Sequence, residues 1–218
     1  CAVRAIRSTR WLDLALDEQV VRAAPEEAAA ALARAAASDL DRALNLARPE
    51  VVALRARVAL LLAHAPELDL PPFDDAALVD LLPELCRGRR TLDALRATDV
   101  TGAWLGRLPW KARQALDTEA PERIEVPSGS RIRLDYTGPE PVLAVKMQEV
   151  FGLAETPRIA KGRVPVLLHL LAPNGRPQQI TRDLHSFWDT TWPEVRKEMR
   201  SRYPKHRWPE DPWAAAPS

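Results

Sequence analysis

The spacing of apolar residues changes at Pro121, where a long helical region ends and a region of strands begins. Upstream of it, apolar residues recur every three or four positions, as Leu32, Ala36 and Leu40 do, which is the period of a helix with one buried face. Downstream of it, apolar and polar residues alternate, which is the period of a strand. The pattern predicts an α+β fold: a bundle-like layer of helices over residues 18–120, followed by a small antiparallel or mixed sheet with C-terminal helices.

Prolines and small polar residues indicate where the helices begin. Pro25, which two glutamates follow, and Pro49 each suit the first turn of a helix. Asp74, Thr91 and Thr98 precede apolar-periodic segments, so we expect each of them to be an N-cap.

One proline and two arginines lie within or beside the apolar faces of these predicted helices. Pro83 lies inside the helical run that follows Asp74, and we expect it to kink or split that helix. Arg55 and Arg57 flank the apolar stripe of the helix that begins at Pro49, and we expect both guanidinium groups to be solvated.

The first seventeen residues are predicted to hold one strand. Leu12, Leu14 and Leu16 alternate with polar or small residues within residues 10–17, the pattern of a half-buried strand. Because the chain opens in mid-pattern without an initiator methionine, we interpret residues 1–17 as the end of a preceding domain of a longer protein.

Alternation after Pro121 predicts a hairpin and further strands. Residues 123–127 and 131–136 flank Ser-Gly-Ser, a hairpin signal that places Arg131 and Arg133 on one strand face. Residues 142–151 fit either a strand or a strand that runs into a helical turn.

Two more strands are expected near the end of this region. Residues 164–171 form a strongly apolar strand candidate, and residues 176–181 form another after a Pro-Asn-Gly turn. Pro177 has no amide hydrogen to donate to a ladder, so this last strand is expected at a sheet edge.

Residues 181–212 concentrate aromatic and basic side chains. They contain three Trp, one Tyr, one Phe, two His and seven Lys or Arg. Thr191 and Glu194 have the spacing of a capping box, which predicts that a helix begins there. Residues 121–212 are taken as one α+β part, and residues 213–218 are expected to be a disordered tail.

Charge is distributed unevenly, although the formal net charge is only +1. Residues 157–218 carry +5, whereas residues 1–120 and 121–156 each carry −2. This asymmetry favours a polyanion or an acidic protein as a partner, with a solvated basic face as the alternative.

Other composition features exclude several classes of protein. The two cysteines, Cys1 and Cys86, are far apart and form no Cys-x-x-Cys or His/Cys cluster, so neither a disulfide framework nor a zinc site is expected. The apolar runs are too short to cross a bilayer and the basic start has no apolar signal core, so a cytoplasmic setting is expected.

Four segments together resemble one known family. They are EVPSGSRIRLDY at 125–136, PVLAVKMQEVFGL at 141–153, GRVPVLLHLLAPNGRPQQITRDLHSFW at 162–188 and EVRKEMRSRYPKHRWPEDP at 194–212. They resemble the C-terminal region of bacterial HrpB-type ATP-dependent RNA helicases, of the DEAH/RHA branch of superfamily 2. The resemblance is close over residues 105–212 and looser over the helices before them.

The resemblance implies that two RecA-like motor domains elsewhere in the protein bind ATP and Mg²⁺. Their Walker A loop, G-x-x-x-x-G-K-[ST], does not occur in this chain, because Arg107 follows Gly106 where lysine would be needed. No nucleophile elbow or metal-ligand cluster occurs either, so we expect no catalytic residue, metal or cofactor in this chain, and an independent enzyme is disfavoured.

Two functional hypotheses follow from the resemblance and the basic end of the chain. The first is an accessory module that binds RNA or another single-stranded nucleic acid beside the motor domains, through phosphate contacts and stacking on Tyr203 or Trp208. The candidate residues are Arg131, Arg133, Lys161, Arg163, Arg182, Arg196, Lys197, Arg200, Arg202, Tyr203, Lys205, His206, Arg207 and Trp208. The alternative is a protein-interaction or regulatory module that packs on its own helicase core through the edge strand at 176–181 or the WPEDPW tail.

Overall fold

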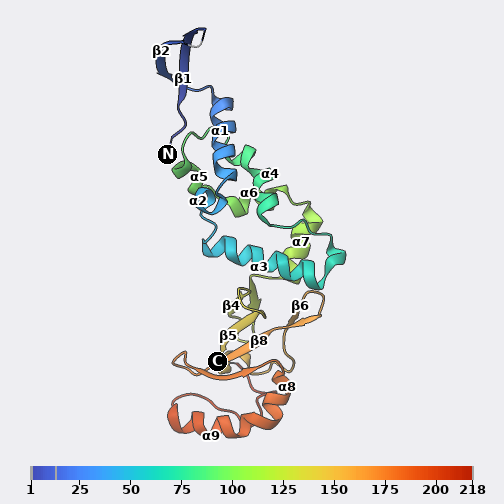
Figure 1. Ribbon diagram of the computed structural model, residues 1–218. Coiled ribbons are helices and arrows are strands. Elements are labelled where there is room, and N and C mark those ends of the chain that lie inside the picture. The colour runs from blue at the N-terminus through green and yellow to red at the C-terminus, as the bar shows by residue number, and fades with distance from the viewer. Residues whose placement is uncertain (1, 13, 218) are drawn as a thin grey trace. The chain divides into compact units, whose positions relative to one another are not determined.

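Figure 1 shows the computed structural model, which describes residues 2–12 and 14–217. The chain divides into two compact units. The first comprises residues 1–55 and 71–109, and the second comprises residues 56–70 and 110–218. The predicted α+β fold is confirmed. Residues 56–70 and 110–120, which the apolar pattern grouped with the other helices, cluster with the sheet.

The first unit opens with a two-stranded antiparallel hairpin, β1 (Ala5–Trp11) and β2 (Leu14–Val21). The single strand predicted over residues 10–17 is therefore wrong, because the turn lies there. Leu12, in that turn, has a φ of 51° and is 88% exposed. The side chains of Leu14 and Leu16 lie outside the described part of the structure, and the assignment of residues 1–17 to a preceding domain stays a prediction.

The base of this hairpin is tied to the first unit by backbone contacts. The Val3 amide donates to the Arg90 carbonyl at 2.9 Å, and the Arg90 guanidinium donates to the Ala23 carbonyl at 2.9 Å. Ala2 also forms an isolated antiparallel bridge with Thr91. The hairpin is thus anchored at its base, and its two strands form a separate two-stranded sheet.

Short helices form the rest of the first unit. They are α1 (Pro25–Ala37), α2 (Leu40–Leu44), the first part of α3 (Pro49–His64), α4 (Asp75–Leu85), α5 (Leu92–Arg96) and α6 (Val100–Arg107). Leu32, Leu44, Leu78 and Leu81 are fully buried between them. This packing confirms the helical period read from the sequence.

Two of the three predicted N-caps are confirmed. The Ala77 amide donates to the Asp74 carboxylate at 2.9 Å, and the Ala94 amide donates to the Thr91 hydroxyl at 3.1 Å. The third is wrong, because Asp99 rather than Thr98 caps α6. The aspartate has a stronger acceptor than the threonine for the free amides of the first turn.

Pro83 lies inside α4 without splitting it. Because proline has no amide hydrogen, the helix lacks the backbone hydrogen bond from residue 83 to the Val79 carbonyl. The helix ends two residues after Pro83. Val79 is 41% exposed, so water can satisfy its carbonyl.

The second unit is built around a mixed sheet in the order β3-β4-β5-β8-β9. The strands are β3 (Arg123–Glu125), β4 (Arg131–Asp135), β5 (Val142–Lys146), β8 (Leu167–Leu171) and β9 (Pro177–Thr181). β5 and β8 are parallel and the other neighbours are antiparallel. A separate pair is formed by β6 (Arg158–Ile159) and β7 (Val164–Pro165).

Several sequence predictions for this unit are confirmed. β3 and β4 form the expected hairpin, and β9 lies at a sheet edge. β5 runs into the 3-10 helix η2 (Met147–Val150), which decides between the two alternatives for residues 142–151. The end of α3, the 3-10 helix η1 (Pro66–Leu68) and α7 (Trp110–Glu119) complete the upstream part of the unit.

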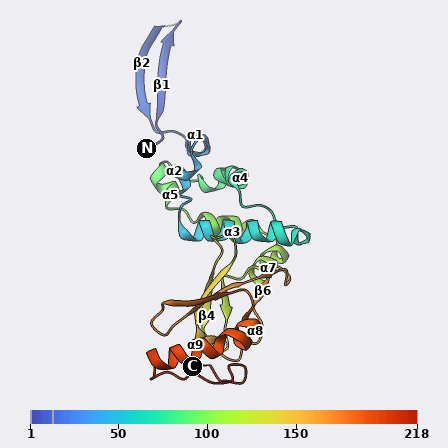
Figure 2. The ribbon, with the colours of Figure 1, turned by 60° about the horizontal axis from the view of Figure 1, so that its bottom comes forward.

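The C-terminal helical segments form one continuous stretch. α8 (Leu184–Ser186), the π-helical segment η3 (Phe187–Thr191) and α9 (Trp192–Arg202) follow one another without a break. Asp183 caps this stretch by accepting the Ser186 amide at 2.9 Å. Thr191 makes no capping hydrogen bond, so the predicted capping box is wrong. Figures 1 and 2 both show α8 and α9 beside one end of the five-stranded sheet.

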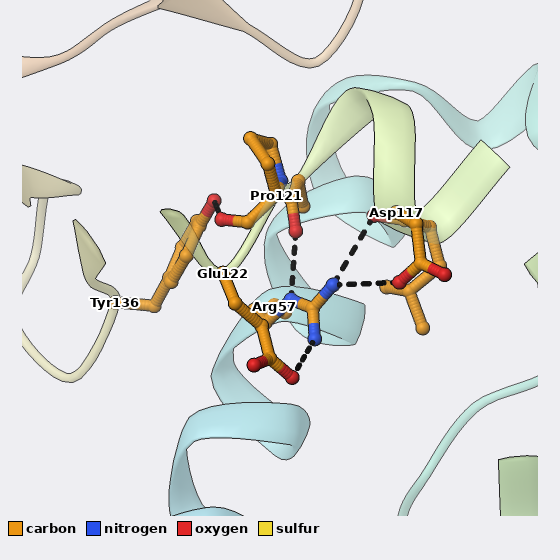
Figure 3. Close-up of polar contacts among 7 residues, drawn as sticks. Arg57, Asp117, Pro121, Glu122 and Tyr136 are labelled. Carbon is orange, nitrogen blue, oxygen red and sulfur yellow. Dashed lines mark hydrogen bonds and ion pairs between the residues drawn. The ribbon is translucent and has the colours of Figure 1, made fainter. Parts of the chain in front are cut away.

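Arg57 on α3 is buried at 3% exposure, contrary to the solvated guanidinium that the sequence predicted. Its Nε donates to the Ala120 carbonyl at 2.7 Å, and a further nitrogen donates to the Leu116 carbonyl at 3.4 Å. Ion pairs join it to Asp117 at 3.2 Å and Glu122 at 3.0 Å (Figure 3). Leu116 lies in the last turn of α7 and Ala120 directly follows the helix, so both carbonyls lie at the negative end of its dipole and attract this cation.

The Arg57→Met variant is expected to lose about 2–3 kcal/mol of unfolding free energy, because buried carbonyls lose charge-assisted hydrogen bonds. Arg55→Met is the matched control on the same helix. Arg55 makes a surface ion pair with Asp75, and such pairs contribute about 1 kcal/mol or less. Urea denaturation followed by circular dichroism measures both variants. Equal losses would contradict the role given to Arg57.

Candidate nucleic-acid interface

The aromatic residues of the C-terminal stretch form a buried cluster. Its members, called the aromatic cluster below, are Phe151, Phe187, Trp188, Trp192 and Trp208. The Trp192 ring lies 5.4 Å from both Phe151 and Trp188 and 6.2 Å from Trp208, measured between ring centroids. Tilted and edge-to-face pairs at these separations stabilise a core beyond the area that they bury.

Each tryptophan of the aromatic cluster also donates a hydrogen bond to the backbone. The indole nitrogen of Trp188 donates to the Leu153 carbonyl at 2.9 Å, and that of Trp192 donates to the Pro209 carbonyl at 3.1 Å. The indole nitrogen of Trp208 donates to the Tyr203 carbonyl at 2.9 Å. The segment after α9 is therefore fixed onto the unit by both packing and hydrogen bonds.

Trp208 cannot serve as the stacking surface predicted from the sequence. It is only 6% exposed, and its ring faces Trp192. Tyr203 is half-buried, whereas His206 is exposed, and their ring centroids lie 6.4 Å apart. Of the predicted aromatic contacts, only Tyr203 and His206 keep a surface that a base can reach.

The last residues pack instead of lying free. The Gly152 amide donates to the Pro212 carbonyl at 2.8 Å, and Ala215 is buried at 7% exposure. Gly152 has a φ of +84°, and an added Cβ would lie 3.4 Å from the Ala215 carbonyl oxygen. The ring of Trp213 meets that of His185 edge-to-face at 4.7 Å. Residues 213–217 thus differ from the disordered tail that the sequence predicted, and Ser218 lies outside the described residues.

Three candidate cations upstream of α9 are held in ion pairs. Arg163 pairs with Glu67 at 2.6 Å and donates to the His64 carbonyl at 2.7 Å, while Lys161 lies 3.8 Å from the same carboxylate. The hydrogen bond from Arg163 lowers the pKa of Glu67 to about 2. Arg182 donates to Glu140 from two nitrogens, at 2.5 and 3.1 Å.

Three candidate cations on α9 are paired as well. Arg196 donates to the Trp208 carbonyl at 3.0 Å and pairs with Glu210 at 2.9 Å, so it joins the helix to the following segment. Lys197 pairs with Glu194 at 2.9 Å, and Arg202 pairs with Glu198 at 3.1 Å. Such exposed pairs within one helix contribute a few tenths of a kcal/mol, about 0.3–0.5 each.

The remaining candidates are exposed and have no ion-pair partner among the described residues. Arg131 and Arg133 lie on β4, and Arg200, Lys205 and Arg207 lie at or just after the end of α9. The assignment of these residues to nucleic-acid binding stays a prediction.

Arg123 on β3 belongs with the β4 arginines although sequence reasoning missed it. It pairs directly opposite Arg133 in the antiparallel register. The sequence could have indicated this pairing. A hairpin with strands of equal length on either side of the short turn places Arg123 on the same sheet face as Arg133.

Two features of residues 2–12 and 14–217 concern metal and thiol chemistry. No group of three or more His, Cys, Asp or Glu side chains there is placed to hold a metal ion. The Cys86 thiol is buried, and burial raises its pKa, which disfavours the reactive thiolate. No helix in these residues has the length and apolar character needed to cross a membrane.

The fold and these contacts define an α+β region whose aromatic residues build its own core. Its candidate cations without an ion-pair partner among the described residues lie on the β3–β4 hairpin and at or after the end of α9. Residues 81–212 match the HrpB family described as ATP-dependent helicase C-terminal. Because this match covers more than half of the chain, the chain belongs to that family.

Named relatives agree with this assignment. The chain is 46% identical over 175 residues to the ATP-dependent RNA helicase HrpB of Escherichia coli (strain K12), which is 78% of this chain and 22% of that protein. The crystal structure of the E. coli DExH-box NTPase HrpB superposes with a TM-score of 0.85 and 39% identity over 97% of this chain. A structure of the Escherichia coli DEAH/RHA helicase HrpB gives a TM-score of 0.73, 39% identity and 93% coverage. This chain spans 27% and 26% of those two solved chains.

Replacing Trp208 tests the core role given to it. Trp208→Ala is expected to lower the unfolding free energy by about 3–5 kcal/mol, because it leaves a cavity beside Trp192 and removes the hydrogen bond to the Tyr203 carbonyl. Trp213→Ala is the matched control, since the ring of Trp213 is only half-buried and makes one edge contact. Far-ultraviolet circular dichroism during guanidinium denaturation measures both. A loss for Trp208→Ala no larger than that of the control would contradict a core role.

Proposed function

We propose that this chain is an accessory region that binds RNA through its phosphates and holds it beside the motor domains of an ATP-dependent helicase. One observation carries the proposal: within a helicase C-terminal family, the second unit keeps a set of cations without a carboxylate partner among the described residues. They are Lys111, Arg113, Arg123, Arg131, Arg133, Lys146, Arg158, Arg176, Arg200, Lys205 and Arg207. Cations that the fold does not neutralise are available to an external polyanion.

The chemistry of these residues favours binding without sequence preference. Arginine and lysine that contact phosphates release condensed counterions, and this term is independent of base identity. Burial of Trp208 removes the strongest base-stacking candidate. Contacts to the sugar-phosphate backbone therefore dominate the proposed mode.

The motor chemistry is proposed to lie outside this chain. ATP and Mg²⁺ would be bound by the RecA-like domains of the longer protein, which need a Walker A loop and an acidic metal-binding motif. Neither motif occurs in these 218 residues. This chain's own residues would orient the RNA and would take no part in hydrolysis.

Titration of the chain with fluorescein-labelled oligouridylate tests RNA binding. We expect binding at 50 mM NaCl and a slope of log K against log salt of about −2 to −3, which corresponds to three or four phosphate contacts at roughly −0.7 each. Fluorescence anisotropy at four salt concentrations measures the slope. A poly-glutamate peptide of equal charge is the control ligand. Absence of binding at 50 mM, or a slope near zero, would contradict the proposed function.

A second candidate function is packing on the motor domains of the same protein, and the hairpin β1–β2 favours it. Ile6 and Val20 are cross-strand partners and are 63% and 69% exposed. A two-stranded hairpin alone is marginally stable in water, so an apolar partner surface would stabilise it.

The two surfaces that the sequence suggested for such packing differ in availability. The WPEDPW tail is engaged within its own unit, because Trp208 and Pro212 are buried and Glu210 pairs with Arg196. The edge strand β9 is open and presents Ile180 at 54% exposure.

Polar substitution of the hairpin pair separates this candidate from the first. Ile6→Thr with Val20→Thr is expected to leave the melting temperature of this chain within about 2 °C of the parent, since both side chains are exposed. In the longer protein that includes the motor domains, the same changes are expected to lower the melting temperature by several degrees. Differential scanning fluorimetry of both proteins measures this. Equal behaviour in the two proteins would argue against packing through the hairpin.

A further inference from the structure

We propose that Arg123, Arg131 and Arg133, called the arginine strip below, are the site that takes the phosphodiester backbone of a single nucleic-acid strand. This inference rests on the proposed RNA-binding function and names its location. It adds Arg123, and it moves the interface from the last helix to the β3–β4 hairpin.

The register of the hairpin places the three guanidinium groups on one face. Arg123 pairs directly with Arg133, and Arg131 pairs with Glu125. Arg131 and Arg133 are two residues apart on one strand, so their Cα atoms are separated by roughly 7 Å at the usual rise per residue. Alternation puts Ile132 and the buried Leu134 on the opposite face.

The arginine strip places two like charges opposite each other, and no ion pair among the described residues neutralises them. Like charges that face each other across two antiparallel strands destabilise the pair. All three side chains belong to exposed residues, and none has an ion-pair partner among the residues that the structure describes. A surface that keeps two arginines directly opposed in this way suits an external anion.

The acids on the same face form no ion pair with the arginine strip among the described residues, although the charge of Arg133 contributes to the lowered pKa of Asp135. The Asp135 carboxylate accepts from the amide and the hydroxyl of Thr137, at 2.9 and 2.6 Å, and these bonds hold its pKa below the usual value. Its oxygens are thus directed to the turn after β4. Glu125 is exposed and makes no ion pair with Arg131 in the described structure.

The arginine strip is also preorganised. One terminal nitrogen of Arg123 donates to the Arg131 carbonyl at 2.9 Å, which fixes that side chain over β4 and leaves its other N–H groups free. The residue before it, Glu122, is held by Arg57 at 3.0 Å, and its carbonyl accepts the Leu134 amide at 3.0 Å. Tyr136 donates to the Pro121 carbonyl at 2.7 Å (Figure 3). A fixed guanidinium loses less entropy when it binds a phosphate.

The cations at the end of α9 have an internal explanation that the arginine strip lacks. Arg200 lies in the last turn of α9, and Lys205 and Arg207 follow it closely. Cations at a helix C-terminus are stabilised by the negative end of the dipole. The hairpin has no helix dipole to stabilise the directly opposed Arg123 and Arg133, so the arginine strip points more directly to a ligand.

The test compares two triple variants of the whole chain, each of which removes three positive charges. The strip variant is Arg123→Gln, Arg131→Gln and Arg133→Gln, and the matched control is Arg200→Gln, Lys205→Gln and Arg207→Gln. Oligouridylate binding is measured by anisotropy between 50 and 200 mM NaCl. We expect the strip variant to lose at least tenfold in affinity at 50 mM and its salt slope to become shallower by about 2, at roughly −0.7 for each lost contact. The control is expected to change less than threefold.

A stability measurement separates a binding role from a structural one. Arg133→Gln is expected to raise the melting temperature at 20 mM NaCl, because it removes the repulsion with Arg123. The gain is expected to vanish at 500 mM NaCl, where salt screens exposed charges. A lowered melting temperature at both salt concentrations would mean that Arg133 supports the fold, and it would overturn the inference.

The outcomes also distinguish the site from the function. If the strip variant binds like the parent while the control variant loses affinity, the assignment of the site to the arginine strip is overturned and RNA binding stands. If both variants bind like the parent, that assignment is overturned as well, and the remaining cations carry the binding. If the parent itself does not bind at 50 mM NaCl, both the function and the site are overturned.

Discussion

A single buried guanidinium organises the second unit. Arg57 reaches from α3 to the last carbonyls of α7 and to two carboxylates, Asp117 and Glu122, that flank the start of the sheet. A buried cation is unfavourable unless acceptors surround it, so α3, the end of α7 and the beginning of β3 must meet at this point. The contact explains why residues 56–70 and 110–120 cluster with the sheet instead of with the other helices.

The aromatic cluster fixes the C-terminal segment onto the second unit, as Arg57 fixes the start of the sheet. Its three tryptophans bury their rings, and each indole nitrogen donates a hydrogen bond to a backbone carbonyl. Arg196 adds a guanidinium that bonds the backbone of the same segment. A stretch rich in Trp and Arg therefore serves chiefly to close its own unit, although its composition resembles that of a nucleic-acid-binding surface.

Neutralisation by neighbouring acids divides the basic residues of this helicase C-terminal region into two groups. Arg163, Arg182 and Arg196 are held by carboxylates and contribute to the fold. The arginine strip and the cations after α9 have no such partner among the described residues, and the proposed RNA contact rests on them. Net charge alone does not separate the groups, because a paired arginine and a free one count equally in the sequence.

Local patterns determined much of this protein from the sequence by itself. The change of period at Pro121, the caps at Asp74 and Thr91, the β3–β4 hairpin and the edge position of β9 depend on neighbouring residues, and the structure confirms them. The family resemblance likewise rested on contiguous segments. Only the tertiary structure decided that Arg57 and Trp208 are buried, that Arg163 meets a glutamate 96 residues away, and that Arg196 bonds the backbone carbonyl of Trp208. These features depend on which segments the fold brings together, and contacts between distant residues leave no period in the sequence.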